Sequence, residues 1–285
     1  MSRMTIPQVT FTQRRAISSF LLYALLILVA GVVLFPLWSA LTISMLSDAE
    51  VALFPPRLWP SHLNLDNFRR ALEQAPLGRY LFNSVIQSTI VMLGQLITAS
   101  LAAFAFAFIN FKGRNILFLV FLSTMMIPWE ATIIPNYLTI RSIGWTDTFQ
   151  GLSAPFLATA FGTFLLRQFF LSLPKELHDA ATIDGSSDFR FLITIVLPLA
   201  RPALGTLAVY SFLQTYNQYL WPLLVTNNQQ MRTVQIGIAL LQDQERFMFN
   251  IVMAGVVMIL VPTFTLFVFG NRQLIRGLTS GAVKG

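Results

Sequence analysis

Few side chains in this sequence could carry covalent or metal chemistry. The 285 residues include no cysteine, which excludes thiolate nucleophiles, thiolate metal ligands and disulfides. The two histidines, His62 and His178, lie far apart, and neither belongs to a group of residues with the spacing of metal ligands. The sequence also has no GxxxxGK[ST] phosphate-binding loop. We therefore expect no catalytic residue, no metal site and no cofactor bound by this chain, which we do not expect to be an enzyme.

Polar side chains inside apolar stretches are better candidates for a functional site. Glu130 lies in one such stretch, where an ionised group is costly and usually faces a water-filled path or a neighbouring helix. Gln214, Tyr216, Asn217 and Gln218 lie in another, and amides with aromatic faces can hold sugars or polyols. The spacing of Gln214, Asn217 and Gln218 predicts one shared helix face. These five residues either line a path for a solute or form hydrogen bonds between helices.

The elements that must position these side chains are transmembrane helices. The chain is 55% hydrophobic and 11% charged, whereas soluble domains carry about 25% charged residues. About 20 apolar residues cross a bilayer as a helix, and six segments reach or approach this length: Ser18–Leu41, Asn83–Ile109, Ile116–Ile134, Leu152–Phe170, Ala203–Val225 and Ile251–Phe269. The first is too long for the apolar region of a signal peptide, about 7–15 residues, so we expect it to be retained. The sequence predicts an all-α membrane protein with six transmembrane helices.

The distribution of basic residues predicts the orientation of these helices. With a cytoplasmic N-terminus, the inner segments hold 12 of the 19 basic residues, namely Arg3, Arg14, Arg15, Lys112, Arg114, Arg167, Lys175, Arg190, Arg201, Arg272, Arg276 and Lys284. Cytoplasmic loops are enriched in Lys and Arg, so both termini are expected in the cytoplasm. The net charge of +7 then reflects topology and does not indicate nucleic-acid binding. Tyr219 and Trp221 are expected in the aromatic belt at the outer interface.

A short charged insert, residues 174–198, follows the fourth apolar segment on the predicted cytoplasmic side. It is expected to form two short helices joined by a turn. Gly185 stands where the first helix must stop, because glycine tolerates the positive φ found there. Ser186 and Ser187 can cap the second helix, and Pro198 and Pro202 are expected to break the exit into the fifth span. From the residues alone, an amphipathic connector lying in the lipid headgroups is an equal alternative.

The pattern of the insert resembles the EAA loop of ABC importer permeases. The resemblance rests on Asp179, Ala180, Ala181, Asp184, Gly185, Ile195 and Pro198, with Asp179 in place of the usual Glu and Ser186 in place of the usual Ala. In that family the loop is a coupling helix that docks on a cytoplasmic ATPase. The resemblance implies an assembly with a second homologous permease (a heterodimer), two ATPase subunits that use ATP and Mg²⁺, an extracytoplasmic substrate-binding protein and surrounding membrane lipid. The implied location is the bacterial inner membrane.

Two further stretches resemble the carbohydrate, or maltose-permease, branch of that family. These are Phe164–Phe170 and Asn217–Leu223, and the stretch around the latter is closest to permeases for sn-glycerol 3-phosphate. The resemblance implies alternating access for a sugar or glycerol-phosphate-type solute. The alternative function is a secondary transporter without an ATPase partner, although its expected internal repeat is not evident. Because the fifth span has no basic residue in its core, we expect the binding protein or partner permease to recognise any solute charge.

The expected organisation follows from these boundaries. Residues 1–46 form an N-terminal cytoplasmic segment and the first transmembrane helix, and residues 47–77 form an extracytoplasmic segment that is either a docking platform or a lid. Residues 78–276 form the permease core with the coupling loop 174–198, and residues 277–285 form a cytoplasmic tail.

Overall fold

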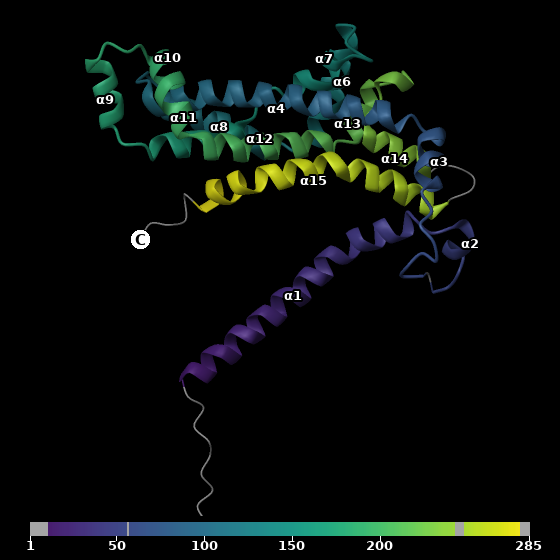
Figure 1. The fold of residues 1–285 in the computed structure, drawn as a ribbon. Coiled ribbons are helices and arrows are strands. Elements are labelled where there is room, and N and C mark those ends of the chain that lie inside the picture. The colour runs from purple at the N-terminus through teal and green to yellow at the C-terminus, as the bar shows by residue number, and fades with distance from the viewer. Residues whose placement is uncertain (1–10, 56, 243–247, 280–285) are drawn as a thin grey trace, which may run out of the picture. The chain divides into compact units, whose positions relative to one another are not determined.

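The structure, a computed structural model, describes residues 11–55, 57–242 and 248–279. The described residues contain helices and no strand, as Figure 1 shows. The α-helices are α1 (Phe11–Ile43), α2 (Asp48–Val51), α3 (Asp66–Gln74), α4 (Leu77–Phe108), α5 (Arg114–Ser123), α6 (Trp129–Ser142), α7 (Phe149–Ser153), α8 (Ala160–Leu171), α9 (Glu176–Ile183), α10 (Asp188–Phe191), α11 (Leu197–Leu199), α12 (Arg201–Tyr216), α13 (Leu220–Val225), α14 (Val234–Gln242) and α15 (Phe249–Thr279). The chain forms two compact units, one of Met1–Arg70 with Met248–Val257 and one of Ala71–Phe247 with Met258–Gly285.

Within the described residues three helices are candidate membrane spans by themselves, and the predicted number of six is reached if each of three bent helix pairs counts as one span. Ser19–Ile43, Leu77–Phe108 and Phe249–Val268 are each long and apolar enough to cross a membrane. The three bent pairs are Arg114–Met126 with Trp129–Ser142, Phe149–Phe156 with Ala160–Leu171, and Asp188–Leu199 with Arg201–Tyr216. The first half of the last pair belongs to the insert 174–198. The all-helical membrane fold is therefore confirmed, while half of its spans are broken.

The third span differs most from the single apolar segment Ile116–Ile134 expected from the sequence. The chain bends by 95° between Met126 and Trp129, and Pro128 is the N-cap of α6. A proline disfavours helical backbone at the residue before it, and Ile127 is accordingly extended, with ψ 114°. Pro135 lies inside α6 without ending it. The span thus becomes two helices that meet at Pro128.

The fifth span also ends earlier than predicted. Helix α12 stops at Tyr216, and the backbone N–H and the side-chain amide of the cap residue Asn217 donate to the Leu213 carbonyl over 3.1 and 2.9 Å. A separate short helix, α13, begins at Leu220 and contains Pro222, which has no N–H to donate into a continuing helix. The predicted span Ala203–Val225 is therefore two helices with a break around Gln218.

Helix α4 is the centre of the larger unit. It packs along α8 and α12, and Figure 1 shows the three helices lying lengthwise beside one another. Small buried residues allow this close approach, including Ala99, Ala103 and Ala203. Gly162 on α8 is another, because a Cβ there would lie 2.9 Å from a methyl carbon of Leu207 on α12. The main apolar core forms where these helices meet the insert.

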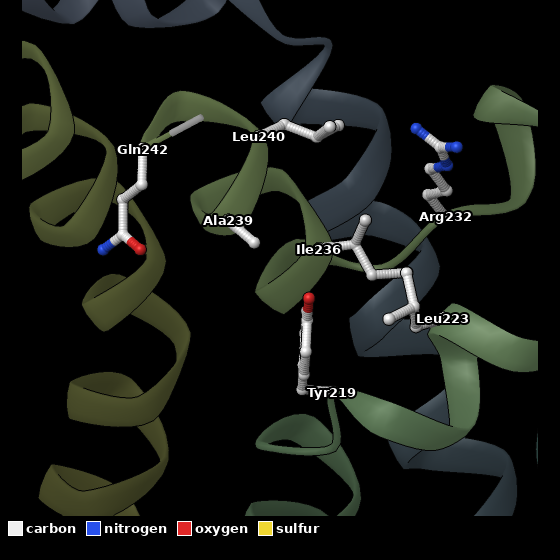
Figure 2. A pocket seen from close by; sticks show the side chains of 7 residues that line it. All are labelled: Tyr219, Leu223, Arg232, Ile236, Ala239, Leu240 and Gln242. Carbon is white, nitrogen blue, oxygen red and sulfur yellow. The ribbon is translucent and has the colours of Figure 1, made fainter. Parts of the chain in front are cut away.

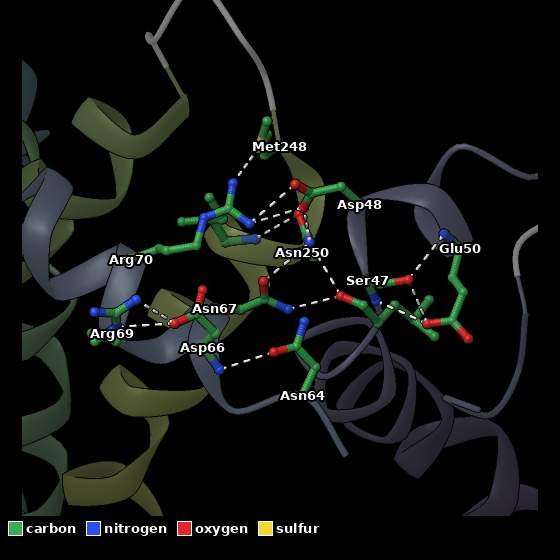
Figure 3. A network of polar contacts seen from close by, with 12 residues as sticks. Ser47, Asp48, Glu50, Asn64, Asp66, Asn67, Arg69, Arg70, Met248 and Asn250 are labelled. Atoms are coloured by element: carbon green, nitrogen blue, oxygen red, sulfur yellow. Dashed lines mark hydrogen bonds and ion pairs between the residues drawn. The ribbon is translucent and has the colours of Figure 1, made fainter. Parts of the chain in front are cut away.

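The smaller unit is held together by buried amides instead. The Asn67 side chain donates a 2.8 Å hydrogen bond to the Leu46 carbonyl, and Asn250 donates to Leu46 and to the Asp48 carboxylate at 3.1 and 2.8 Å (Figure 3). Both asparagines are fully buried. Arg70 lies 3.0 Å from the same carboxylate, and its hydrogen bond lowers the pKa of Asp48 below the ordinary value. This network fixes part of the predicted extracytoplasmic segment to the start of α15.

Candidate coupling loop and solute path

The insert forms the two helices and the turn that the sequence predicts. Helix α9 ends in a Schellman motif, in which the Gly185 N–H donates to the Thr182 carbonyl over 3.0 Å and the Ser186 N–H donates to Ala181 over 2.9 Å. Gly185 has a φ of +73°, and a Cβ on it would have no atom within 4 Å. Glycine is therefore favoured at position 185 by the positive φ, and a side chain there would meet no steric obstacle.

The second helix of the insert extends beyond α10. Ser187 caps α10, and its hydroxyl accepts a hydrogen bond from the Arg190 N–H over 3.3 Å. The helix continues through a π-helical segment, Leu192–Val196, and then through α11. The chain next bends by 80° at Ala200, before α12 begins. The predicted break in the exit is confirmed, and it lies between Pro198 and Pro202.

The side chain of His178 ties the two helices of the insert together. Its Nε2 lies 3.4 Å from an oxygen of Asp188, and its ring stacks on Phe108 of α4 with 5.5 Å between centroids. The Phe191 ring lies edge-on to His178, with 5.0 Å between centroids, and is also 5.4 Å from the Phe108 ring. The histidine thus has a packing role between α4, α9 and α10, which makes the insert a rigid projection of the main core.

The resemblance residues divide between the surface and the core. Asp179, Ala180, Asp184 and Pro198 are exposed and remain available to a partner. Ala181 is buried in the main apolar core and Ile195 packs against it. Ala181 therefore faces the permease itself and is not available to a partner.

Two exposed apolar side chains of the insert were missed by the sequence analysis. Ile183 is 87% exposed and Phe189 is 65% exposed, and they lie on either side of the Gly185 turn. Apolar residues next to a helix-stop glycine in a polar insert are the signal that could have identified them. Exposed apolar groups rimmed by polar ones commonly mark an interaction site, so Ile183 and Phe189 join the candidate coupling surface.

The structure places Glu130 at the bend of the third span. Glu130 lies in the first turn of α6, where the helix dipole favours a carboxylate. Its side chain is exposed, and it forms neither a hydrogen bond nor an ion pair with the part of the chain that the structure describes. The alternative of a hydrogen bond to a neighbouring helix of the same chain therefore has no support here. A role in the solute path stays a prediction.

The amides of the fifth span do not share one helix face, which corrects the prediction from their spacing. Gln214 lies on α12, exposed, and its amide donates to the Tyr210 hydroxyl over 3.0 Å. Asn217 is the cap, is exposed, and accepts a 3.3 Å hydrogen bond from Gln235. Gln218 lies past the helix end and accepts from the buried Gln87 over 3.1 Å. The shared face fails because α12 ends at Tyr216.

Tyr216 and Trp221 have packing roles in the described conformation. Tyr216 is 2% exposed, and its hydroxyl donates a 2.8 Å hydrogen bond to the Ile259 carbonyl of α15. Trp221 is 1% exposed and donates to the carbonyls of Gly151 and Leu152, each at 3.2 Å. The expected place of Trp221 in an aromatic belt is therefore wrong, because its ring is buried in the protein.

A helical membrane fold with broken spans and a projecting helix–turn–helix insert defines the class of a binding-protein-dependent permease. The chain belongs to this class: residues 75–276 match the family of binding-protein-dependent transport system inner membrane components. Its fold is that of a bacterial ABC transporter involved in the import of the acidic polysaccharide alginate, with a TM-score of 0.79, 23% identity, and coverage of 94% of this chain and 99% of that one. A second alginate transporter structure, with a periplasmic protein bound, gives a TM-score of 0.67 at 16% identity, covering 91% of this chain and 95% of that one.

Curated relatives are similar over almost the full length. The sn-glycerol-3-phosphate transport system permease protein UgpE of Rhizobium meliloti (strain 1021) is 34% identical over 93% of this chain and 98% of its own. The UgpE protein of Escherichia coli O1:K1 / APEC is 36% identical over 90% of this chain and 94% of its own. The chain is thus an ABC importer permease, and the alternative of a secondary transporter is not supported.

Proposed function

We propose that this permease imports a glycerol-phosphate-type solute, with sn-glycerol 3-phosphate as the first compound to test and small saccharides as the second. The observation that carries the proposal is the full-length similarity to permeases named for sn-glycerol 3-phosphate, at 34–36% identity. The similar region contains the end of α12, where Gln214 lies, and the break between α12 and α13, where Asn217 and Gln218 lie.

The proposed assembly contains this chain, a second homologous permease, two ATPase subunits and an extracytoplasmic substrate-binding protein. ATP and Mg²⁺ are used by the ATPase subunits alone. The rigid insert, with Ile183 and Phe189 exposed beside Gly185, supports docking of the insert on an ATPase. Closure of the ATPase dimer then moves the two inserts together and opens the spans outward. This mechanism requires the insert and both termini in the cytoplasm, as the basic residues indicate.

Purification and reconstitution test this proposal in two steps. The tagged chain is purified from its native membrane, and we expect the second permease and the ATPase to co-elute with it. The complex is then placed in proteoliposomes with its binding protein, and ATP-dependent uptake is measured for labelled sn-glycerol 3-phosphate and for maltose. Uptake of sn-glycerol 3-phosphate alone supports the proposal. Uptake of maltose alone makes the permease a saccharide importer, and elution without an ATPase contradicts the assembly.

A further inference from the structure

A pocket of about 450 Å³ lies between α13 and α14 in the larger unit (Figure 2). Pockets for small ligands have volumes from about 300 to 1,000 Å³. Four aliphatic side chains line it together with three that can donate hydrogen bonds: Leu223, Ile236, Ala239 and Leu240, then Tyr219, Arg232 and Gln242. In Figure 2 Arg232 and Gln242 lie on opposite sides of the view, with the Tyr219 hydroxyl between them. Among the described residues that line it, none is acidic and Arg232 is basic, so their chemistry favours an anion.

The charge of Arg232 is not neutralised within the described part of the chain. Its Nε atom is fully buried and has no hydrogen-bond partner, and its side chain forms no ion pair with any described residue. The polar group that interacts with it is the Tyr80 hydroxyl, which is neutral and also buried without a partner of good geometry. The Arg232 side chain is partly buried as a whole. A guanidinium keeps its charge at every physiological pH, and leaving one of its N–H groups buried without a partner is costly.

The backbone around Arg232 is fixed against α4. The Asn83 amide donates to the carbonyls of Gln230 and Arg232 at 2.7 and 2.9 Å. Gly237 of α14 lies so close to Tyr80 that a Cβ there would be 2.7 Å from the ring. Arg232 is therefore presented to the pocket from a rigid support, which is the arrangement that a binding site requires.

We propose that this pocket binds the anionic group of the solute, a phosphate monoester, and that Arg232 is the residue that recognises it. The planar guanidinium can donate two parallel hydrogen bonds to phosphate oxygens. The Tyr219 hydroxyl and the Gln242 amide then bind the hydroxyls of the same molecule. The proposal rests on the proposed function, and it places charge recognition in this chain as well as in its partners.

The test compares charge variants of the full complex in proteoliposomes with its binding protein. We expect Arg232→Gln to lower the uptake of sn-glycerol 3-phosphate by about 10- to 100-fold, as for the loss of a charge-assisted hydrogen bond. The matched control is Arg79→Gln, which removes the same charge from an exposed arginine outside the pocket that donates to the Gln230 carbonyl. The same binding protein is used in every assay, so a difference in uptake between the variants comes from this chain.

A cysteine at the same position separates recognition of the solute from a loss of folding. The chain has no cysteine, so Arg232→Cys gives one new thiol in this subunit. After assembly, an aminoethyl methanethiosulfonate restores a positive charge and should recover most uptake, while a sulfonatoethyl reagent should recover none. The wild-type complex receives both reagents as a control. Recovery to the same extent by both reagents, or by neither, overturns the proposal.

Two other outcomes also overturn the inference. The first concerns Asp243 and Glu245, two acids outside the described residues. If Asp243→Asn or Glu245→Gln lowers uptake as much as Arg232→Gln does, Arg232 forms an ion pair within this chain and does not recognise the solute. The second concerns the ATPase activity that the binding protein stimulates. If Arg232→Gln abolishes this stimulation even with a binding protein that carries no solute, Arg232 contacts the binding protein and not the solute. Absence of sn-glycerol 3-phosphate uptake in the wild-type complex refutes the proposed function instead, so the two failures are distinguished.

Discussion

The side chain of Gln87 in α4 donates a 3.1 Å hydrogen bond to the side-chain oxygen of Gln218, just past the end of α12. Gln87 is 1% exposed, and the same amide nitrogen also donates to the Leu152 carbonyl at 3.2 Å. One buried amide thus joins three segments that are far apart in sequence. The break in the fifth span is therefore held in place by α4.

Replacing Gln218 with leucine should lower the thermal stability of the complex. Hydrogen bonds between membrane helices contribute about 0.6 kcal/mol on average and up to about 1.7 kcal/mol, and the leucine removes the only acceptor that Gln218 offers to Gln87. Gln214→Leu is the control, because Gln214 is exposed and its amide donates to Tyr210 on its own helix. The measurement is the unfolding midpoint in detergent. Equal shifts for both variants would show that the bond to Gln87 contributes nothing.

Replacing Gly185 with valine should uncouple transport from ATP hydrolysis. A positive φ costs a β-branched residue about 1–3 kcal/mol, so the Schellman turn should open. Nothing lies within 4 Å of a Cβ at this position, so Gly185→Asn tests the backbone alone. Asparagine tolerates the left-handed conformation and should keep most activity. Substrate-stimulated ATPase activity and uptake are measured together, and normal coupled uptake by Gly185→Val would remove the insert from the coupling mechanism.

Single cysteines test the predicted orientation of the membrane helices. Ser187 is exposed in the insert and His62 is exposed in the predicted extracytoplasmic segment. A membrane-impermeant maleimide added to intact spheroplasts should label His62→Cys and leave Ser187→Cys unmodified. After permeabilisation both should react, which checks that each thiol is accessible. Labelling of Ser187→Cys in intact spheroplasts would refute the cytoplasmic insert.

The apolar segments that form candidate spans could be predicted from the sequence, whereas the positions of their bends could not. A bilayer demands a length of apolar helix that can be counted residue by residue. The location of a break depends on neighbouring segments: Pro128 and Pro135 look alike in the sequence, yet the chain bends only at Pro128. A proline inside a membrane helix is tolerated when the surrounding protein satisfies the freed carbonyl.

The turn and the helix cap of the insert could be predicted because their signals are local. The positive φ of Gly185 and the Ser187 cap each depend on a few neighbouring residues. The burial of Trp221 depends instead on its hydrogen bonds to carbonyls of α7, about seventy residues earlier in the chain. The charge of Arg232 was missed for the same reason, because only the fold brings that residue to a pocket with Tyr219.

Acid should weaken the turn between α1 and α3 through Glu50. The Ser61 hydroxyl, together with the backbone N–H groups of Ser47 and Ser61, donates to the Glu50 carboxylate and lowers its pKa from 4.5 to about 2. A depressed pKa stabilises the folded state above pH 4.5, and this stabilisation is lost as the pH falls towards 2.

The variant Glu50→Gln isolates this contribution. Its unfolding midpoint should lie below that of the wild type by a constant amount above pH 4.5, and the gap should narrow steadily between pH 4.5 and 3. Intermediate points at half-unit steps define the slope. A gap that is independent of pH over this range would show that the Glu50 carboxylate titrates alike in the folded and unfolded states.

Replacing Asn217 with leucine should slow uptake about 2- to 10-fold, the effect of losing one neutral hydrogen bond to the solute. Asn217 is exposed at the break of the fifth span, and its carboxamide donates to Leu213 and accepts from Gln235. Gln235→Leu is the matched control, because it removes the bond to Asn217 and leaves the Asn217 amide in place. Uptake in proteoliposomes is compared at matched protein amounts, with binding-protein affinity measured separately. Equal slowing by both variants would assign Asn217 to packing between α12 and α14, whereas slowing by Asn217→Leu alone places its amide on the solute path.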